Sequence, residues 1–523
     1  MFVSEFTSLA EVLVIASFLG LLLRRINVSP VIAYLVSGII GVELGLNYSS
    51  SIFQFLTFLA VNLLSFEMGV SVNLIDLKKI FRRALFIVLT EFLVVTTVVM
   101  LISLFIRLNF ISTILLVVIG FNTSTSIAYK LAEKTLDQND LKIVLSVSSL
   151  EDTVAFVVLG VISSNSFNLI EIIVSALISI TLGYLISKLL INPTINFSDD
   201  SIILSGVASV FLFNILSQLL NIPSTLASFL LGIGTSYASS DSEKIVKSIK
   251  PLTDFTLILF FFVAGSYIKL STYLFYALPI SIVLVLTKYI AFSTAYWISG
   301  IEFIRAFRTG LFMSSLSEFG IVISLTALQE GLPVLSAYNI SSIVVAISST
   351  IASIVTTRNK AIISILNKIY YKLSLNKVDN IVRRASSHQF KIPEIVIVMV
   401  RYIIISVTIT FSGAYLIYLL YTISPFLIYV SYILIVVIPA MLFILLVTTT
   451  NNIRGKYGEA EFIVELFFVI VFIINVFEFE IFFLKLISFN IIAFILSIVI
   501  GSIITILSFS RIKKLLEDIE KLF

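Results

Sequence analysis

Long apolar runs recur almost from one end of this 523-residue sequence to the other, and they constrain its fold more than any other feature. A run of about 20 apolar residues can cross a bilayer as a helix, which satisfies its own backbone groups there. Charged residues make up only 12% of the chain, whereas soluble proteins carry about 25%. We therefore predict an all-α polytopic membrane protein. The thirteen spans predicted before residue 358 are 8–24, 31–46, 51–72, 83–106, 111–132, 141–163, 169–190, 201–220, 223–239, 251–268, 273–299, 305–329 and 335–357.

The residue types that are scarce in the chain exclude several kinds of site. Cysteine is absent, and the single histidine, His388, lies in a polar loop. Disulfides and Cys-ligated metals are therefore excluded, and a His-based metal site or triad is not expected. No Gly-rich phosphate-binding fingerprint follows a predicted strand, so we expect no nucleotide-binding domain, no cofactor and no enzyme active site. The net charge of +4 reflects loop lysines and arginines rather than a basic patch for nucleic acid.

Lys and Arg are distributed unevenly between the loops. They collect after odd-numbered spans, whereas Arg107 and Lys269 are the exceptions after even-numbered spans. Cytoplasmic loops carry the excess of positive charge in membrane proteins. We therefore expect a multi-pass protein of the plasma membrane, with its N-terminus outside and its C-terminus in the cytoplasm.

A weak internal repeat supports this orientation. The segment Asn27–Gly38 is similar to Asn221–Gly232, at a constant offset of 194 residues. Two six-helix halves then flank a linker helix at 169–190, and the predicted orientation makes the halves inverted. Inverted repeats place substrate sites near the bilayer midplane, at broken helices. The same offset maps the polar run at 120–127 onto 314–321.

Polar residues interrupt two predicted helices where apolar residues are expected. Ser and Thr also occur in intact helices, bonded to the carbonyl four residues earlier. We favour two crossed, broken helices, because five consecutive polar residues are more than this bonding to the helix backbone explains. Glu318 would then neutralise the positive ends of half-helices, or it is a packed, protonated acid. The candidate residues are Asn122, Thr123, Ser124, Thr125, Ser126, Ser314, Ser317 and Glu318.

Two adjacent carboxylates, Glu151 and Asp152, lie within a predicted membrane helix. An ionisable group at bilayer depth is a functional-site hypothesis by default. Neighbours on a helix point about 100° apart, so one can face a water-filled cavity while the other faces a helix partner. Close carboxylates also titrate as a coupled pair. This arrangement suits a proton-coupled cation site, and the alternative is a buried carboxylate satisfied by hydroxyls.

Lys288 lies in the middle of another apolar run. A buried lysine needs a counter-charge, which Glu151 or Asp152 would supply. The alternative is a lysine that snorkels to the interface. Glu67 and Glu91 are further intramembrane carboxylates without a companion in the sequence, and their roles stay open between structural and functional.

The chain becomes polar at 358–392, which we interpret as a cytoplasmic linker with an amphipathic helix at Ile362–Leu373. A further transmembrane region of about four helices follows at 393–509, and a cytoplasmic amphipathic tail at 510–523. The four apolar runs lie near 394–422, 425–448, 460–477 and 479–508.

Six segments, in order, are similar to motifs of one transporter family, the monovalent cation:proton antiporters. Residues 8–357 resemble in particular its electrogenic sodium/proton antiporters and glutathione-gated potassium efflux systems. The resemblance covers the first 357 residues and excludes the four added helices. The segments are Leu64–Gly69, Thr123–Ile127, Glu151-Asp152, Phe260–Gly265, Lys288 and Ser317–Gly320.

The resemblance implies a homodimer in membrane lipid that works by an elevator movement. It implies a scaffold of 8–72 and 201–268, and an ion-binding core of 83–163 and 273–357 within a domain of 1–357. Glu replaces the Asp usual at the first acidic position, and Ser-Leu-Ser replaces the usual Gly-rich sequence before the second-half glutamate.

The resemblance also assigns roles to individual residues. Asp152 would bind the transported alkali cation or the proton, Glu151 would be the partner of Lys288, and Thr123 and Ser124 would complete the ion site. We thus predict exchange of H⁺ for Na⁺ or K⁺, in the service of pH homeostasis. The alternatives are an organic-anion symporter on a similar scaffold and a non-transporting membrane sensor.

Overall fold

The computed structural model describes residues 2–25, 30–45, 51–72, 74–133, 135–163, 169–219, 222–239, 241–269, 273–329, 331–372, 379–380, 392–423, 428–453 and 460–486. The backbone in these ranges is almost entirely helical, and it contains one isolated antiparallel bridge, between Thr123 and Leu316. The prediction of an all-α chain is confirmed for this part of the protein. His388, the linker residues 373–378 and 381–391, and the predicted tail at 510–523 lie outside the described residues.

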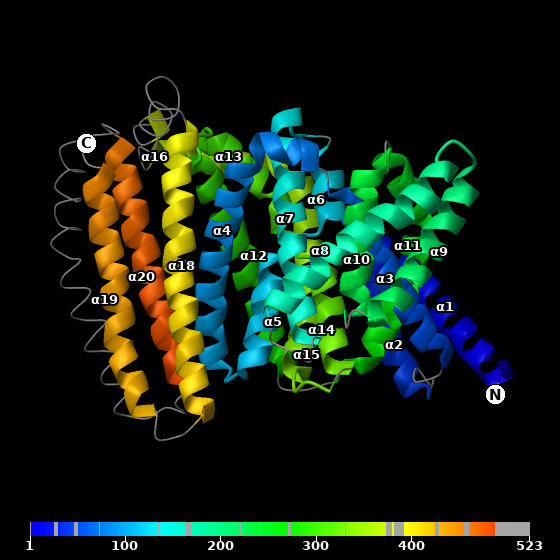
Figure 1. Cartoon of the computed structure of the whole chain (residues 1–523). Coiled ribbons are helices and arrows are strands. Elements are labelled where there is room, and N and C mark those ends of the chain that lie inside the picture. Colours follow the sequence, from blue (N-terminus) through cyan, green and yellow to red (C-terminus); the bar gives the residue numbers. More distant parts are fainter. Residues whose placement is uncertain are drawn as a thin grey trace. The chain divides into compact units, whose positions relative to one another are not determined.

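Internal contacts divide the chain into two compact units, and the helices of each are labelled in Figure 1. Unit 1 comprises Met1–Ile80, Ile114–Val285 and Phe312–Thr357. Unit 2 comprises Phe81–Thr113, Leu286–Leu311 and Arg358–Phe523. Three helices contribute residues to both units: α4 (Leu74–Phe105), α5 (Phe110–Phe121) and α12 (Tyr273–Ile298).

The other helices belong to one unit each. Those of unit 1 are α1 (Phe2–Arg25), α2 (Pro30–Glu43), α3 (Ser51–Ser71), α6 (Thr125–Ala132), α7 (Gln138–Ser163), α8 (Leu169–Ile186), η1 (Ser187–Ile191), η2 (Asn192–Thr194), α9 (Asp199–Leu219), α10 (Ser224–Ala238), α11 (Ser242–Tyr267), η3 (Phe312–Ser314), α14 (Phe319–Gln329) and α15 (Leu335–Thr357). Those of unit 2 are α13 (Phe303–Gly310), α16 (Asn359–Lys372), α18 (Ile392–Ile423), α19 (Ile428–Ile453) and α20 (Ala460–Leu486).

Both predicted helix breaks are present. The run predicted at 111–132 separates into α5 and α6 at residues 122–124. The run predicted at 305–329 separates into α13, the short helix η3 and α14, with residues 315–318 in non-helical backbone. The polar side chains thus mark the points where the backbone leaves the helix.

Two glycine crossings hold four helices of unit 1 at close range. A Cβ added to Gly38 on α2 would lie 2.8 Å from the Cα of Gly265 on α11. A Cβ added to Gly232 on α10 would lie 2.8 Å from the Cα of Gly69 on α3. The internal repeat relates α2 to α10 and α3 to α11, so it exchanges one crossing for the other. Backbones this close leave no room for any side chain larger than that of glycine.

In unit 2, α18, α19 and α20 pack against one another, and a buried polar network joins α18 to α20. Asn475 on α20 accepts a hydrogen bond from Thr410 at 2.9 Å and donates one to Ser406 at 3.3 Å, both on α18. The sequence-based break between 460–477 and 479–508 is wrong, because α20 continues through Glu478 to Leu486. No Gly or Pro interrupts this stretch, and Glu478 remains inside the helix because Thr97 on α4 donates to its Oε1 at 3.0 Å.

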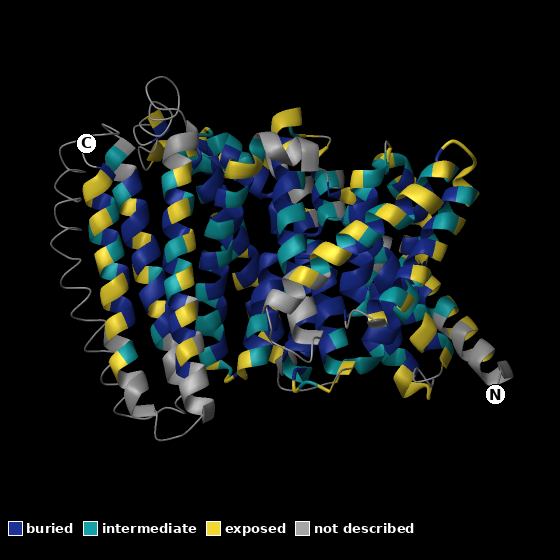
Figure 2. Ribbon diagram, viewed as in Figure 1, coloured by how far each residue is buried: buried dark blue, intermediate teal, exposed yellow. Residues whose placement is uncertain are grey.

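Several of these helices suit a membrane by length and composition. Within the described ranges, eight are long and apolar enough to cross one, and shorter apolar helices include α2, α5 and α14. One face of α19 exposes Ile433, Met441 and Ile444, as expected of a helix that faces lipid (Figure 2). The prediction of a polytopic membrane protein agrees with this distribution.

Candidate functional site

The candidate site lies where the non-helical parts of the two interrupted runs pass each other in unit 1. The backbone N–H of Ser124 donates to the Ser315 carbonyl at 2.9 Å, and that of Ser317 donates to the Asn122 carbonyl at 3.0 Å. Each segment therefore donates once and accepts once. Ser124 and Ser317 are 193 positions apart, as are Asn122 and Ser315, so the crossing follows the internal repeat to within one residue.

Both adjacent carboxylates of α7 reach the first of these segments. Glu151 Oε2 accepts a hydrogen bond from the Thr123 backbone N–H at 2.7 Å, and Asp152 Oδ2 accepts one from the Thr125 hydroxyl at 3.2 Å. The side chains of Glu151 and Asp152 are both buried. The two acids diverge as predicted, since Glu151 holds the non-helical backbone and Asp152 binds the first residue of α6.

Several buried polar atoms around the crossing have no hydrogen-bond partner among the described residues. They are Asp152 Oδ1, both amide atoms of Asn122, Thr123 Oγ1 and Ser315 Oγ. The Asn122 amide lies beside the Asp152 carboxylate but outside hydrogen-bonding geometry. Buried polar atoms are normally satisfied, so a cluster of such atoms calls for an explanation, and an ion or water is one. Four of these five atoms are oxygens, and oxygen is the ligand that hard cations prefer.

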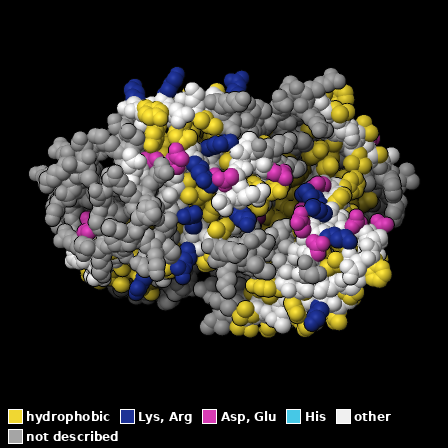
Figure 3. All heavy atoms as spheres, turned by 90° about the horizontal axis from the view of Figure 1, so that it is seen from above, with side chains coloured by type: hydrophobic (Ala, Val, Ile, Leu, Met, Phe, Trp, Pro, Cys, Tyr) yellow, Lys and Arg dark blue, Asp and Glu magenta, His cyan; other side chains and the backbone are white. Residues whose placement is uncertain are grey.

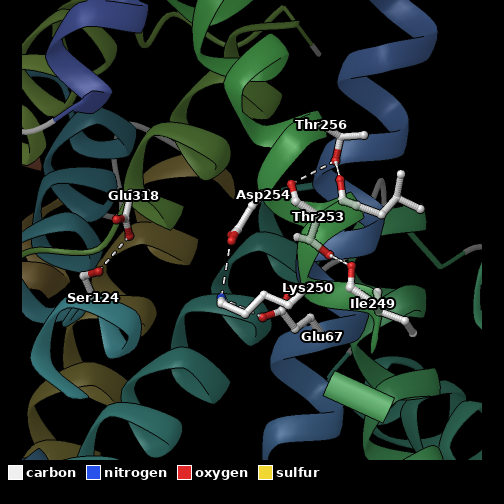
Figure 4. A network of polar contacts seen from close by, with 9 residues as sticks. Glu67, Ser124, Ile249, Lys250, Thr253, Asp254, Thr256 and Glu318 are labelled. Carbon is white, nitrogen blue, oxygen red and sulfur yellow. Dashed lines mark hydrogen bonds and ion pairs between the residues drawn. The ribbon is translucent and has the colours of Figure 1, made fainter. Parts of the chain in front are cut away.

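Glu318 lies at the start of two half-helices (Figure 4). The Ser124 hydroxyl donates to Glu318 Oε2 at 2.9 Å. Ser124 immediately precedes α6, and Glu318 immediately precedes α14. The first backbone N–H groups of a helix carry a partial positive charge. The carboxylate is therefore in a position to balance both helix ends, which agrees with one of the two interpretations of its sequence position.

The other predicted crossover residues contribute to the same region. Ser314 is buried at the end of η3, and Ser317 Oγ accepts the backbone N–H of Phe319 at 3.1 Å. The side chain of Ser126 lies outside the described part of the protein. Sequence reasoning missed Ser348 on α15, whose hydroxyl accepts the Leu316 N–H at 3.2 Å. The run of three hydroxyl residues at 348–350 was the available signal.

Lys288 and Glu91 form an ion pair within unit 2. Lys288 Nζ on α12 lies 3.5 Å from Glu91 Oε1 on α4, and both side chains are fully buried. The burial argues against a lysine that snorkels to the interface. Glu91 had no companion in the sequence, and the structure supplies one 197 positions away. The pairing of Lys288 with Glu151, a residue of unit 1, stays a prediction.

A second ion-pair cluster joins α3 and α11 in unit 1 (Figure 4). Lys250 Nζ lies 3.2 Å from Glu67 Oε1 and 3.6 Å from Asp254 Oδ1. Lys250 and Asp254 are one turn apart on α11, and Asp254 is the more exposed of the two. Glu67 thus has a cationic partner, which sequence reasoning did not identify.

Comparison with known proteins identifies the family. The sequence profile described as "Sodium/hydrogen exchanger, transmembrane" matches residues 13–358, about two thirds of the chain. The chain belongs to the sodium/hydrogen exchanger family. The match includes the crossing, both carboxylates of α7 and Lys288, and it ends before the added helices α18 to α20. The resemblance to cation:proton antiporters is therefore confirmed, and family membership supports cation/proton antiport.

A solved structure supports the same fold for this exchanger-family chain. It is the sodium proton antiporter MjNhaP1 from Methanocaldococcus jannaschii at pH 8, with a TM-score of 0.54 and 15% sequence identity. The alignment covers 69% of this chain and 98% of the archaeal chain. At this identity the likeness concerns the fold alone, which confirms an antiporter fold for most of the chain. A search of the curated proteins returns no match.

The candidate ligands at the crossing are oxygens of several residue types. Among the described residues, no three His, Cys, Asp or Glu side chains are close enough together to hold a metal ion. The crossing offers carboxylate, hydroxyl and amide oxygens instead. Carbonyls of unwound helices and half-helix ends coordinate Na⁺ or H⁺ in transporters built from inverted repeats.

Proposed function

We propose that this chain is a secondary-active antiporter that exchanges protons for Na⁺ or K⁺, and that the cation and the proton compete for Asp152. The observation that carries the proposal is the buried Asp152 carboxylate. One of its oxygens binds Thr125, whereas the other has no partner among the described residues. An ionised carboxylate is a ligand for a cation, and its neutral form holds the proton, so occupation by one excludes the other. Membership of the exchanger family supports this chemistry.

Neighbouring groups would divide the remaining tasks. Thr123 and Asn122 would add oxygen ligands, since both offer buried oxygens without a described partner. Ser124 would anchor Glu318 at the helix ends. Glu151 would fix the crossing through the Thr123 N–H while it acts as the charge partner of Lys288. A lysine near two carboxylates would favour the ionised form of one of them.

The proposed movement is an elevator-like displacement of a core against a scaffold, which alternates access to Asp152. The proposed scaffold, 8–72 and 201–268, contains both glycine crossings and the Glu67–Lys250 ion pair. The proposed core, 83–163 and 273–357, contains the crossing bridge of Thr123 and Leu316. The first set of contacts lies inside the proposed scaffold, and the second lies inside the proposed core. Each body could therefore move as a whole without breaking them.

The membrane arrangement follows from charge and from the family resemblance. We propose a homodimer in the plasma membrane, with the N-terminus outside and the C-terminus in the cytoplasm. The loop charges support this orientation, because Lys and Arg collect on one side of the predicted spans.

The test is proton flux in liposomes that carry the purified full chain and a trapped pH dye. Wild type should move protons when Na⁺ or K⁺ is added, and a scan of Na⁺, K⁺ and Li⁺ identifies the cation. Asp152→Asn keeps an oxygen that accepts the Thr125 bond but removes the charge, so flux should fall to that of empty liposomes. Asp254→Asn is the matched control, because this carboxylate is exposed and outside the crossing.

The outcome that refutes the assignment is cation-dependent flux in Asp152→Asn equal to that of wild type at equal protein content. Absence of flux in wild type for every cation would favour a membrane sensor instead. Glu151→Gln and Lys288→Gln should change the pH dependence of flux or the charge moved per cycle. If both variants show the same pH dependence and the same charge per cycle as wild type, the proposed pairing of Glu151 with Lys288 is refuted.

A further inference from the structure

A cavity of about 310 Å³ lies between α4 and α18 in unit 2. Most of its wall is aliphatic, and α18 supplies the larger share. Arg82 from α4 and Arg401 from α18 are the charged members of the lining. The aliphatic members are Leu85, Ile397, Val400, Ile404 and Ile405.

Part of the aliphatic lining lies deeper than the two arginines. Both helices begin at the same end of unit 2 and run in the same direction (Figure 1). Arg82 is near the start of the apolar span Ile80–Phe105, and Arg401 is near the start of Ile397–Ala414. Leu85 and Ile404 lie three residues further along their helices, about 4.5 Å deeper at 1.5 Å per residue. Ile397 and Val400 precede Arg401 on α18, so the two arginines lie in a largely aliphatic wall whose deeper part is Leu85, Ile404 and Ile405.

Both arginines are available to a ligand. Their side chains are exposed, and neither forms a hydrogen bond or an ion pair with a described residue. The face seen from above in Figure 3 carries Lys and Arg side chains together with Asp and Glu among apolar ones. Guanidinium groups bind phosphates through paired N–H donors, and the lining of this cavity contains two of these groups.

We propose that this cavity binds an anionic phospholipid, with its phosphate at Arg82 and Arg401 and part of one acyl chain against Leu85 and Ile404. The volume is at the lower end for ligand sites, which suits a chain segment rather than a whole lipid. A sugar, a nucleotide or a peptide would find no side-chain acceptor in the lining, whereas an amphiphile with an anionic head uses both parts of it. The site involves α18, which lies outside the matched family region, and it does not depend on the transport proposal.

The test is native mass spectrometry of the full chain in detergent, titrated with dioleoyl-phosphatidylglycerol or dioleoyl-phosphatidylcholine. Wild type should retain one phosphatidylglycerol more tightly than phosphatidylcholine. A basic side chain near an anionic headgroup contributes about 1 kcal/mol, which is about fivefold in affinity. Arg82→Gln and Arg401→Gln should each weaken phosphatidylglycerol retention about fivefold, and the double variant should remove the preference.

Two further variants separate the parts of the site. Arg83→Gln removes the adjacent charge on α4 but no lining group, so phosphatidylglycerol retention should stay as in wild type. Leu85→Trp fills the cavity without a change of charge and should weaken retention of phosphatidylglycerol. Equal retention of both lipids by wild type, or an unchanged preference in the double variant, would overturn the proposal. So would displacement of phosphatidylglycerol by equimolar inorganic phosphate or oleate, because the site would then not require a phospholipid.

Discussion

Substitution of Lys288 by Met removes the cation from an ion pair that is wholly buried in unit 2. Glu91 would then lose the counter-charge of Lys288, and a buried pair that loses one partner costs about 3–5 kcal/mol. The carboxyl can instead take up a proton. Protonation of a glutamate, whose pKa in water is about 4.3, costs about 3.7 kcal/mol at pH 7, which sets a ceiling on the part of the penalty that comes from the unpaired charge.

The ceiling depends on pH, and so should the measured loss of stability. It falls by about 1.4 kcal/mol per pH unit, to about 1 kcal/mol at pH 5. Lys288→Met should therefore lose most stability relative to wild type at neutral and alkaline pH, and little at acid pH. The double variant with Glu91→Leu removes both charges and should recover most of the loss, because paired apolar groups replace buried ion pairs at little cost.

The assay is unfolding by denaturing detergent, followed by fluorescence of Trp297, the single tryptophan of the chain. This residue reports on unit 2, where its indole N–H donates to Asp379 at 2.9 Å. Lys247→Met is the matched control, because the Lys247–Glu243 pair is exposed, and its midpoint should not change. An unchanged midpoint for Lys288→Met at pH 8 would refute the reasoning. Rescue by Glu151→Gln rather than by Glu91→Leu would assign Lys288 to Glu151.

Three more substitutions test other parts of the fold. Gly232→Ala should destabilise unit 1 by about 1–3 kcal/mol through forced separation of two helices, whereas Gly20→Ala, with its nearest neighbour at 3.9 Å, should not lower the thermal midpoint. Glu318→Gln should keep the unfolding midpoint but lower cation-driven proton flux, since it removes the charge at two helix ends; undiminished flux would count against that role. Thr97→Val should cost about 1–3 kcal/mol by removal of the donor to buried Glu478, and Thr97→Ser should restore the wild-type unfolding midpoint.

The helix breaks were predictable because they depend on local chemistry. Five polar residues in succession cannot be accommodated in a lipid-facing helix, and the run at Asn122–Ser126 showed this directly. The register of the crossing was not predictable. The register is defined by the backbone hydrogen bond from the Ser124 N–H to the Ser315 carbonyl and by its counterpart in the other direction. The offset of 194 residues in the sequence repeat differs by one residue from the offset of 193 at the crossing.

Charge partners were the least predictable part. The sequence identified Lys288 and Glu91 as costly residues at bilayer depth, but their contact depends on the rotation and packing of α12 and α4. The periodicity of apolar residues predicts which face of a helix is buried, but it does not predict which other helix packs against that face. The predicted break at Glu478 failed for a related reason, since a tertiary partner on α4 lets the acid stay inside a continuous helix.

The reciprocal bonds at the crossing have the form of a contact between two copies of one molecule. Ser124 donates to Ser315 as Ser317 donates to Asn122, so corresponding residues exchange roles as they do across the twofold axis of an isologous dimer. Glu151 and Asp152 have no acidic counterparts at the corresponding positions 344 and 345, which are both Val. The backbone contact at the crossing is therefore close to twofold symmetric, whereas the charged side chains of α7 belong to the first half alone.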